Sequence, residues 1–241
     1  MKTSLRATAA SCLGVSGKLS VRRDVFGYIW GPMDRRLSVK THLQRIRGTA
    51  FNLCVFLVGH DPGFGGWFDQ DEARQPQHAI DVMRELYAQV GVGVRKIYWR
   101  YIPVAEATGY FSLDGAEATD LTEDFSGPND GLDVFYVQLI TDAGGWSKRN
   151  GSCDKNKTGE RTGSVIEVQG SNSTASLNFG GILLAHEVGH YLGLAHADTI
   201  TNVMGSDTDG DGIGTINSTS VNLTTSQGNT MKGHCSIKSA C

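Results

Sequence analysis

The segment His186–His196 constrains this chain more than any other part of the sequence. It reads HEVGHYLGLAH and holds three histidines within eleven residues. Residues four apart on a helix lie on the same face, so His186 and His190 can bind one metal ion together. Gly193 is expected to end that helix, because glycine adopts the left-handed conformation without a Cβ penalty, and the turn then brings His196 back. Three neutral imidazoles with one open position predict a catalytic rather than a structural zinc site.

Glu187 directly follows the first histidine, and we interpret it as the general base of this site. It projects about 100° around the helix axis from its neighbour, so its carboxylate borders the metal without occupying a ligand position. Zinc lowers the pKa of a bound water towards neutrality. Glu187 would accept the proton of that water as the water attacks a substrate, and would then deliver the proton to the leaving group.

The pattern HExxHxxGxxH resembles the signature of the metzincin zinc peptidases. Met204 stands eight residues after His196, in the sequence NVMG, and resembles the methionine of the family's Met-turn. This spacing is similar to the matrixin branch, whereas HEVGHYLGL resembles the pappalysin branch. Some metzincins place a tyrosine two residues after the methionine. This chain has Ser206 there, so we assign no such tyrosine.

The resemblance implies a zinc-dependent endopeptidase that cleaves protein or peptide substrates. It implies that His186, His190 and His196 bind the zinc. It also implies that Glu187 activates the water and that Met204 forms an apolar floor beneath the metal. The alternative is a zinc-binding recognition or toxin-like module that uses the same scaffold without cleavage. The intact Glu187 argues against that alternative, because a site that only binds needs no base.

The predicted elements follow the order strand, helix, strands and active helix, in agreement with the upper subdomain of a metzincin. Apolar patterns predict strands at 50–59, 93–104, 132–141 and 163–170, a helix over 76–90, and an active helix from Ser173 or Ser176 to Leu192. The resemblance implies an α+β fold: a twisted, mostly parallel sheet, two main helices above the zinc cleft and a small irregular C-terminal subdomain.

Charge divides the chain near residue 48. Residues 1–48 hold ten Lys or Arg and two Asp, a net charge of +8, and the remainder carries −11. We expect 1–48 to be a basic N-terminal segment and 49–241 to be the metzincin-like catalytic domain. Within that domain, 49–193 would form the upper subdomain and 194–241 the lower one. The basic segment is a candidate pro-segment or delivery element, and a solvated arm is an equal alternative.

The five cysteines form no CxxC pair, which excludes a cysteine zinc ribbon. Cys235 and Cys241 are close enough in sequence to form a disulfide, and Cys153 lies in a polar loop. Some metzincins are kept latent by a pro-segment cysteine that binds the zinc. Cys12 is the candidate for that role here, and a free or disulfide-bonded cysteine is the other interpretation. His234, beside Cys235, is a weak candidate for a second metal site.

An acidic segment follows the Met-turn. Asp207, Asp209 and Asp211 resemble the start of a calcium loop, but the twelfth position is Ser218 rather than glutamate. The segment is therefore a candidate Ca²⁺ site of another geometry, with a flexible acidic loop as the equal alternative. Asp198 is a candidate to hydrogen-bond a ligand imidazole, with a solvated loop residue as the other interpretation.

Other features limit the partners and the location of the protein. No run of about eighteen apolar residues occurs, so no membrane span is expected. No zinc-finger or RNA-recognition signature accompanies the basic segment, so we expect no nucleic-acid partner. The N-terminus lacks a continuous apolar h-region. We therefore recognise no signal peptide in this chain. We expect the protein to be extracellular or exported, and to be a monomer.

Overall fold

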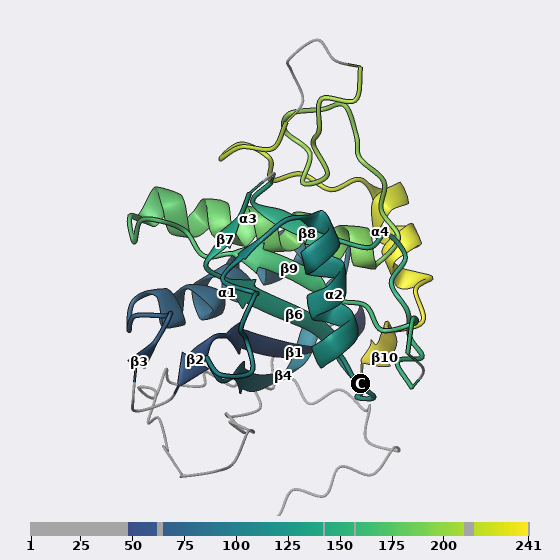
Figure 1. Cartoon of the computed structure of the whole chain (residues 1–241). Coiled ribbons are helices and arrows are strands. Elements are labelled where there is room, and N and C mark those ends of the chain that lie inside the picture. Colours follow the sequence, from purple (N-terminus) through teal and green to yellow (C-terminus); the bar gives the residue numbers. More distant parts are fainter. Residues whose placement is uncertain (1–47, 62–64, 142, 157, 210–214, 241) are drawn as a thin grey trace, which may run out of the picture.

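The computed structural model describes residues 48–61, 65–141, 143–156, 158–209 and 215–240. Four features of the sequence interpretation lie outside these residues: nearly all of the basic N-terminal segment, Cys12, Asp211 and Cys241. The described part has a mixed α/β fold with a mostly parallel sheet (Figure 1).

The main sheet is built around one long buried strand. Its strands are β1 Gly48–Val58, β4 Val92–Ile102, β6 Leu132–Val137, β8 Gly145–Ser147, β9 Ser164–Glu167 and β10 Lys238–Ala240. β4 and β6 flank β1 in parallel, and β9 continues the parallel sheet beyond β6. The edge strand β8 and the short β10 run antiparallel to their partners. Residues 50–58 of β1 are all buried, as expected of a parallel strand that is covered on both faces.

Two smaller pairs of strands lie outside the main sheet. β2 His60–Asp61 pairs with β3 Gly65–Gly66, and β5 Ser112–Leu113 pairs with β7 Leu139–Ile140. The strand predicted over 132–141 is therefore interrupted at Gln138, with one part in the main sheet and the other beside β5.

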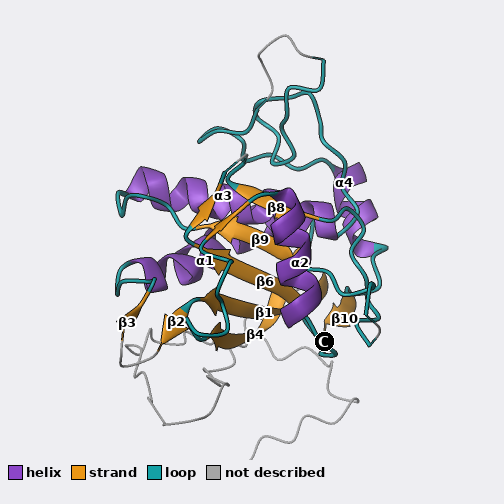
Figure 2. Cartoon of the chain, viewed as in Figure 1, coloured by secondary structure: helices purple, strands orange, loops and turns teal. Residues whose placement is uncertain are grey.

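Helices cover both faces of the main sheet (Figure 2). They are η1 Glu72–Arg74, α1 Gln75–Ala88, α2 Gly115–Phe125, α3 Thr174–Tyr191 and α4 Thr225–Lys232. Side chains of α1 and α3 form one core layer with alternate residues of β1, and α2 forms the other layer with the remaining residues. No helix of the described chain has the length and apolar character needed to cross a membrane.

α1 and α3 pack closely, and this contact explains a glycine inside the second helix. A Cβ on Gly181 would lie 2.4 Å from the Cβ of Val82, so the two backbones approach where a side chain would not fit. The hydroxyl of Tyr87 on α1 donates a hydrogen bond of 2.7 Å to the carbonyl of Ala185 on α3. The position of α3 on the sheet is therefore set by both packing and a buried hydrogen bond.

α2 was not among the elements that the sequence predicted, and it lies between the strands predicted over 93–104 and 132–141. Its start has a capping box, in which Asp114 accepts from the backbone N–H of Glu117 and the Glu117 carboxylate accepts from the N–H of Asp114. Its apolar stripe is short, with only Ala118 and Leu121 as buried apolar residues. The helical periodicity of apolar residues is therefore too weak to predict this helix from the sequence. α4, in the polar C-terminal region, was equally hard to place and also begins with a capping box.

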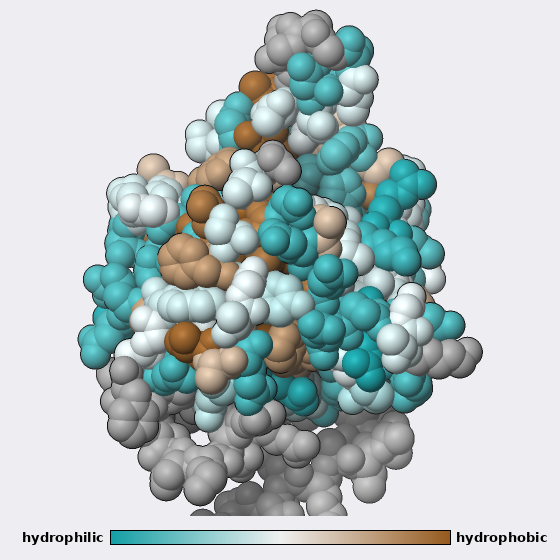
Figure 3. Space-filling view, viewed as in Figure 1, coloured by the Kyte–Doolittle hydropathy of each residue, from teal (hydrophilic) through white to brown (hydrophobic). Residues whose placement is uncertain are grey.

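The segment 194–224 contains no helix or named strand among its described residues and extends away from the sheet (Figure 1). Apolar side chains gather mainly in the two core layers, and the face in Figure 3 is mostly hydrophilic with limited apolar patches. The large apolar side chains that the described surface exposes are Phe111, Leu139, Ile200 and Val221. Scattered exposure of this kind is ordinary for a folded domain.

Candidate metal centre

The three histidines are placed by one helix and the turn that ends it. α3 begins at a cap in which the Ser173 hydroxyl accepts from the N–H of Ser176. Gly193 has φ +98° and stands just past the end of the helix. The N–H of Leu194 bonds to the carbonyl of Gly189, and the N–H of Gly193 bonds to the carbonyl of His190. These two bonds make a Schellman motif, which reverses the chain at this point.

The imidazoles of His186, His190 and His196 converge. The Nε2 atom of His190 lies 3.1 Å from Nε2 of His186 and 2.9 Å from Nε2 of His196. Zn–N bonds of 2.0–2.1 Å require ligand nitrogens roughly 3 Å apart, so this set of donors fits a single zinc ion. His186 is buried, His190 is half-buried and His196 is exposed, which leaves one side of the group accessible.

Backbone carbonyls orient two of these rings. Nδ1 of His186 lies 2.8 Å from the carbonyl oxygen of Val203, and Nδ1 of His190 lies 3.0 Å from that of Leu194. A carbonyl only accepts, so each Nδ1 carries the proton and each Nε2 presents its lone pair. Burial lowers the pKa of His186 to about 4 and also lowers the pKa of His190, which favours the neutral ligand form.

Glu187, the residue after His186 on α3, is buried, with 5% of its surface exposed. A Cβ on Gly145 would lie 2.6 Å from Cγ of Glu187 and 2.8 Å from its Oε1, so the backbone of β8 passes directly against the carboxylate. Burial raises the pKa of Glu187 to about 8. A nearby cation favours the ionised form of a buried carboxylate, so this residue is suited to a site that holds a metal.

Met204 is fully buried beneath α3. A Cβ on Gly189 would lie 2.6 Å from the sulfur of Met204, so glycine allows the methionine to lie against the helix between two histidines. The backbone around Met204 is a turn, and its carbonyl accepts from the N–H of Ala197, the residue after His196. The structure thus places Met204 against α3 at Gly189, and its role as a floor beneath the zinc stays a prediction.

Sequence reasoning missed the group that supports this turn. The Asn202 side chain is 6% exposed, and its Oδ1 accepts from the N–H of Met204 at 2.9 Å. The side-chain amides of Asn202 and Gln227 also bond to each other, at 2.8 and 3.0 Å. Gln227 belongs to the capping box of α4, so this pair connects the turn to that helix. Nothing local in the sequence identifies an amide pair 25 residues apart.

The acidic segment is only partly described. Carboxylate oxygens of Asp198, Asp207 and Asp209 lie within 4.8 Å of one another, and Asp211 is outside the described residues. Calcium binding here stays a prediction. Among the described contacts, the Nδ1 atoms of His186 and His190 meet backbone carbonyls rather than Asp198. Asp198 is exposed, which fits the interpretation of a solvated loop residue.

Cys235 is bonded to Cys153, 82 residues away in the sequence, and not to Cys241, the pairing that closeness in sequence allowed. Cys54 is a buried free thiol. The ligand atoms of His234, Cys153 and Cys235 lie within 4.8 Å of one another, the two cysteines being joined as a disulfide, and a second metal site at His234 stays a prediction. Nδ1 of His234 accepts from the N–H of Ser236 at 3.2 Å, and its Nε2 lies 3.0 Å from the carbonyl of Gly151. Closeness in sequence was a poor guide here, because the fold brings the loop of Cys153 against the C-terminal segment.

Two solved structures resemble the chain at low sequence identity. Archaemetzincin from Methanopyrus kandleri is 16% identical with a TM-score of 0.47, over 76% of this chain and 93% of its own. Metalloproteinase-II from Bacteroides fragilis is 12% identical with a TM-score of 0.48, over 82% of this chain and 56% of its own. The chain therefore spans little more than half the length of the second protein. No protein-family model and no curated protein matches the sequence.

Proposed function

We propose that this chain is a zinc-dependent endopeptidase that hydrolyses peptide bonds in protein or peptide substrates. The observation that carries the proposal is the convergence of three imidazole Nε2 atoms, 2.9 and 3.1 Å apart. The buried Glu187 directly follows the first of these histidines on α3. His186, His190 and His196 would hold the zinc ion. When bound there, zinc polarises a substrate carbonyl and makes a water acidic enough to act near neutral pH.

Glu187 is the general base in this proposal. Its carboxylate takes the proton from the attacking water and later passes that proton to the amine that leaves. The carbonyls of Val203 and Leu194 keep two imidazoles in the tautomer whose Nε2 lone pair faces the centre. Gly145 keeps the space beside Glu187 free of a side chain, so that the carboxylate retains its position.

We further propose that the chain is of the metzincin type. The features that support this are the HExxHxxGxxH spacing, the left-handed Gly193 that returns the chain to His196, and the buried Met204 against Gly189 of α3. The matrixin-like and pappalysin-like alternatives stay open. The exported location and the monomeric state stay predictions, and so does the bound calcium ion.

The competing function is a zinc-binding recognition or toxin-like module without cleavage. Glu187 favours the enzyme, because a buried carboxylate that binds no zinc costs free energy and adds nothing to recognition. The test is digestion of casein, with cleavage sites mapped by mass spectrometry. We expect cleavage that a chelator abolishes, that zinc restores and that Glu187→Gln removes. Zinc binding without any cleavage of casein or of a mixed peptide library would favour the module.

A further inference from the structure

The end of the zinc-binding helix is held by a separate loop, residues 150–153. The carbonyl of His190 accepts from the N–H of Asn150 at 2.9 Å, in addition to its bond from Gly193. The carbonyl of Tyr191 accepts from the N–H of Gly151, also at 2.9 Å. The last carbonyls of a helix have no partner within it, so this loop gives the Tyr191 carbonyl a donor and gives the His190 carbonyl a second one. We call residues 150–153 the clamp loop.

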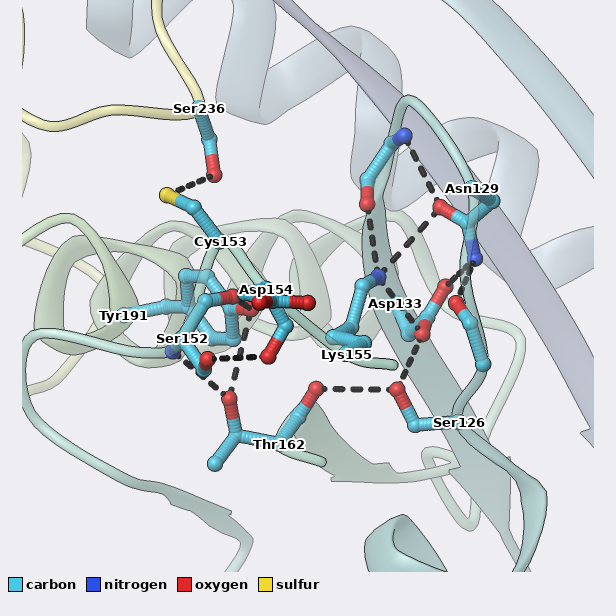
Figure 4. Close-up of polar contacts among 12 residues, drawn as sticks. Ser126, Asn129, Asp133, Ser152, Cys153, Asp154, Lys155, Thr162, Tyr191 and Ser236 are labelled. Atoms are coloured by element: carbon cyan, nitrogen blue, oxygen red, sulfur yellow. Dashed lines mark hydrogen bonds and ion pairs between the residues drawn. The ribbon is translucent and has the colours of Figure 1, made fainter. Parts of the chain in front are cut away.

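Tyr191 joins the clamp loop to the helix through its side chain (Figure 4). Its hydroxyl donates to the carbonyl of Ser152 at 2.5 Å and accepts from Oγ1 of Thr162 at 3.3 Å. Oγ1 of Thr162 in turn accepts from the N–H of Ser152. A Cβ on Gly151 would lie 2.3 Å from the Tyr191 ring, so the ring lies directly on the loop backbone. Tyr191 is the residue next to the ligand His190, and both are fixed by the same loop.

The Cys153–Cys235 disulfide attaches the clamp loop to the C-terminal segment. His234, which precedes Cys235, reinforces this attachment. Since its Nδ1 accepts from the N–H of Ser236, its Nε2 carries the proton and donates to the carbonyl of Gly151. The Tyr191 and His234 rings also contact each other, with centroids 5.7 Å apart. Both cysteines are exposed, so a reductant can reach the bond.

Beyond the disulfide, the chain is anchored to the sheet by an ion pair that reduction does not affect. Nζ of Lys155 lies 2.8 Å from Oδ2 of Asp133 on β6 and donates to the carbonyl of Gly131 at 2.8 Å (Figure 4). Asp133 also accepts from Ser126 and Asn129. A buried pair is stable only when its remaining groups are bonded, and here they are. Loss of the disulfide should therefore loosen the clamp loop without unfolding the domain.

We propose that the clamp loop holds the zinc ligands in position, with Tyr191 as a positioning residue, and that reduction of Cys153–Cys235 weakens zinc binding. This inference rests on the proposed zinc site. The ring of His190 is oriented by the Leu194 carbonyl, in the turn that continues to His196. The clamp loop holds the start of that turn through the carbonyls of His190 and Tyr191. A looser clamp loop leaves the imidazoles less well ordered before zinc binds. Ordering them during binding then costs free energy, so the affinity for zinc falls.

The reductant should be a water-soluble phosphine, because thiol reductants bind zinc themselves. The S–S bond breaks, water supplies the oxygen that converts the phosphine to its oxide, and the two protons of the water leave thiols on Cys153 and Cys235. The double variant Cys153→Ser with Cys235→Ser lacks this reaction. It therefore separates the effect of this disulfide from any effect of the reductant on Cys12 or Cys241.

The test is zinc affinity, measured by competition with a chromophoric chelator on folded full-length protein. We expect the reduced wild type, the double variant and Tyr191→Phe each to bind zinc about tenfold more weakly than the oxidised wild type. The phosphine should not change the double variant. Tyr110→Phe is the matched control, because it removes a hydroxyl bonded to Asp124 at 2.6 Å on α2 and should leave zinc affinity unchanged.

The outcomes separate this inference from the function on which it rests. A merely structural clamp loop would lower the denaturation midpoint while zinc affinity stayed the same, and that result would overturn the inference alone. If the double variant does not fold, reduced wild type and Tyr191→Phe still decide. An oxidised wild type that binds no zinc would overturn the proposed function and the inference together.

Discussion

The two walls of the metal centre are built in different ways. One wall is α3, in which residues 180–189 are all buried and His186 and Glu187 take their places from helix geometry. The other wall is the segment 194–224, which supplies His196 and Met204 but has no helix or strand among its described residues. That second wall is held by turns, by two isolated bridges and by the Asn202–Gln227 amide pair.

The two walls differ in whether local sequence or long-range contacts place their residues. Within α3, a ligand pair follows from local spacing, and long-range contacts only fix the position of the helix on the sheet. We call residues 194–224 the irregular wall and α3 the helical wall. In the irregular wall, His196 reaches the centre because distant groups support the turn around Met204. These groups include Gln227 and the carbonyl of Asn222. Each wall also supports the other, since the Val203 carbonyl in the irregular wall orients His186 in α3.

The largest expected effect is on the chemistry of the helical wall. Glu187→Gln should lower turnover by about 100- to 10,000-fold, because the general base is lost, while the three imidazoles keep the metal. Turnover of casein and zinc content are measured together. Glu85→Gln, an exposed position on α1, is the control and should behave as wild type. A Glu187→Gln protein with near wild-type turnover would contradict the mechanism.

Met204→Ala tests the anchor of the irregular wall. Removal of a fully buried methionine leaves a cavity beneath the histidines and should cost about 2–5 kcal/mol in the free energy of unfolding. Zinc affinity should fall as well, since the floor of the site is lost. Met83→Ala, which is equally buried but lies on α1, should cost a similar free energy without the fall in affinity of the folded protein. Equal zinc affinities for the two variants would show that Met204 supports the metal site no more than Met83 does.

Gly181→Ala tests the packing of the helical wall. Alanine favours a helix more than glycine does, but the new methyl group meets Val82, so we expect a loss of about 1–3 kcal/mol in unfolding free energy. Gly170→Ala adds the same methyl group where nothing lies within 4 Å and should be nearly neutral. Chemical denaturation measures both. A stabilised Gly181→Ala protein would show that α1 and α3 do not pack as closely as described.

The smallest effect is expected from Asn202→Ala. It leaves the N–H of Met204 and Nε2 of Gln227 without the oxygen to which they donate and should cost about 1–2 kcal/mol. Because the turn also orients His186 through Val203, the exchange rate of bound zinc should rise. Thr119→Ala, which removes a side-chain bond on the exposed face of α2, should not change that rate. Identical exchange rates for the two variants would show that the turn around Met204 does not influence zinc binding.

The sequence predicted the regular elements better than the parts that long-range contacts hold in place. The buried strand over 50–59, the helix over 76–90 and the active helix were predictable, because a long apolar run or a regular period marks each of them, and they correspond to β1, α1 and α3. The strand predicted over 163–170 was found as the shorter β9. α2 was not predicted, because its apolar stripe is short, although its capping box was readable between Asp114 and Glu117.

At the site, the convergence of His186 and His190 follows from spacing on one helix. The closeness of β8 to Glu187, which requires Gly145, could not be predicted, because it depends on where the edge strand lies in the folded sheet. The Cys153–Cys235 pairing depends in the same way on tertiary structure. The sequence left the pairing open, with Cys241 as the nearer candidate, because separation along the chain says little about distance across a fold.

The most direct test of the central claim is anomalous X-ray scattering at the zinc edge, measured on crystals grown from the zinc-loaded chain. We expect one strong peak about 2.0–2.1 Å from the Nε2 atoms of His186, His190 and His196, with Glu187 beside it and not among the ligands. A peak bound by other residues, or no peak between these imidazoles at full zinc occupancy in solution, would contradict that claim.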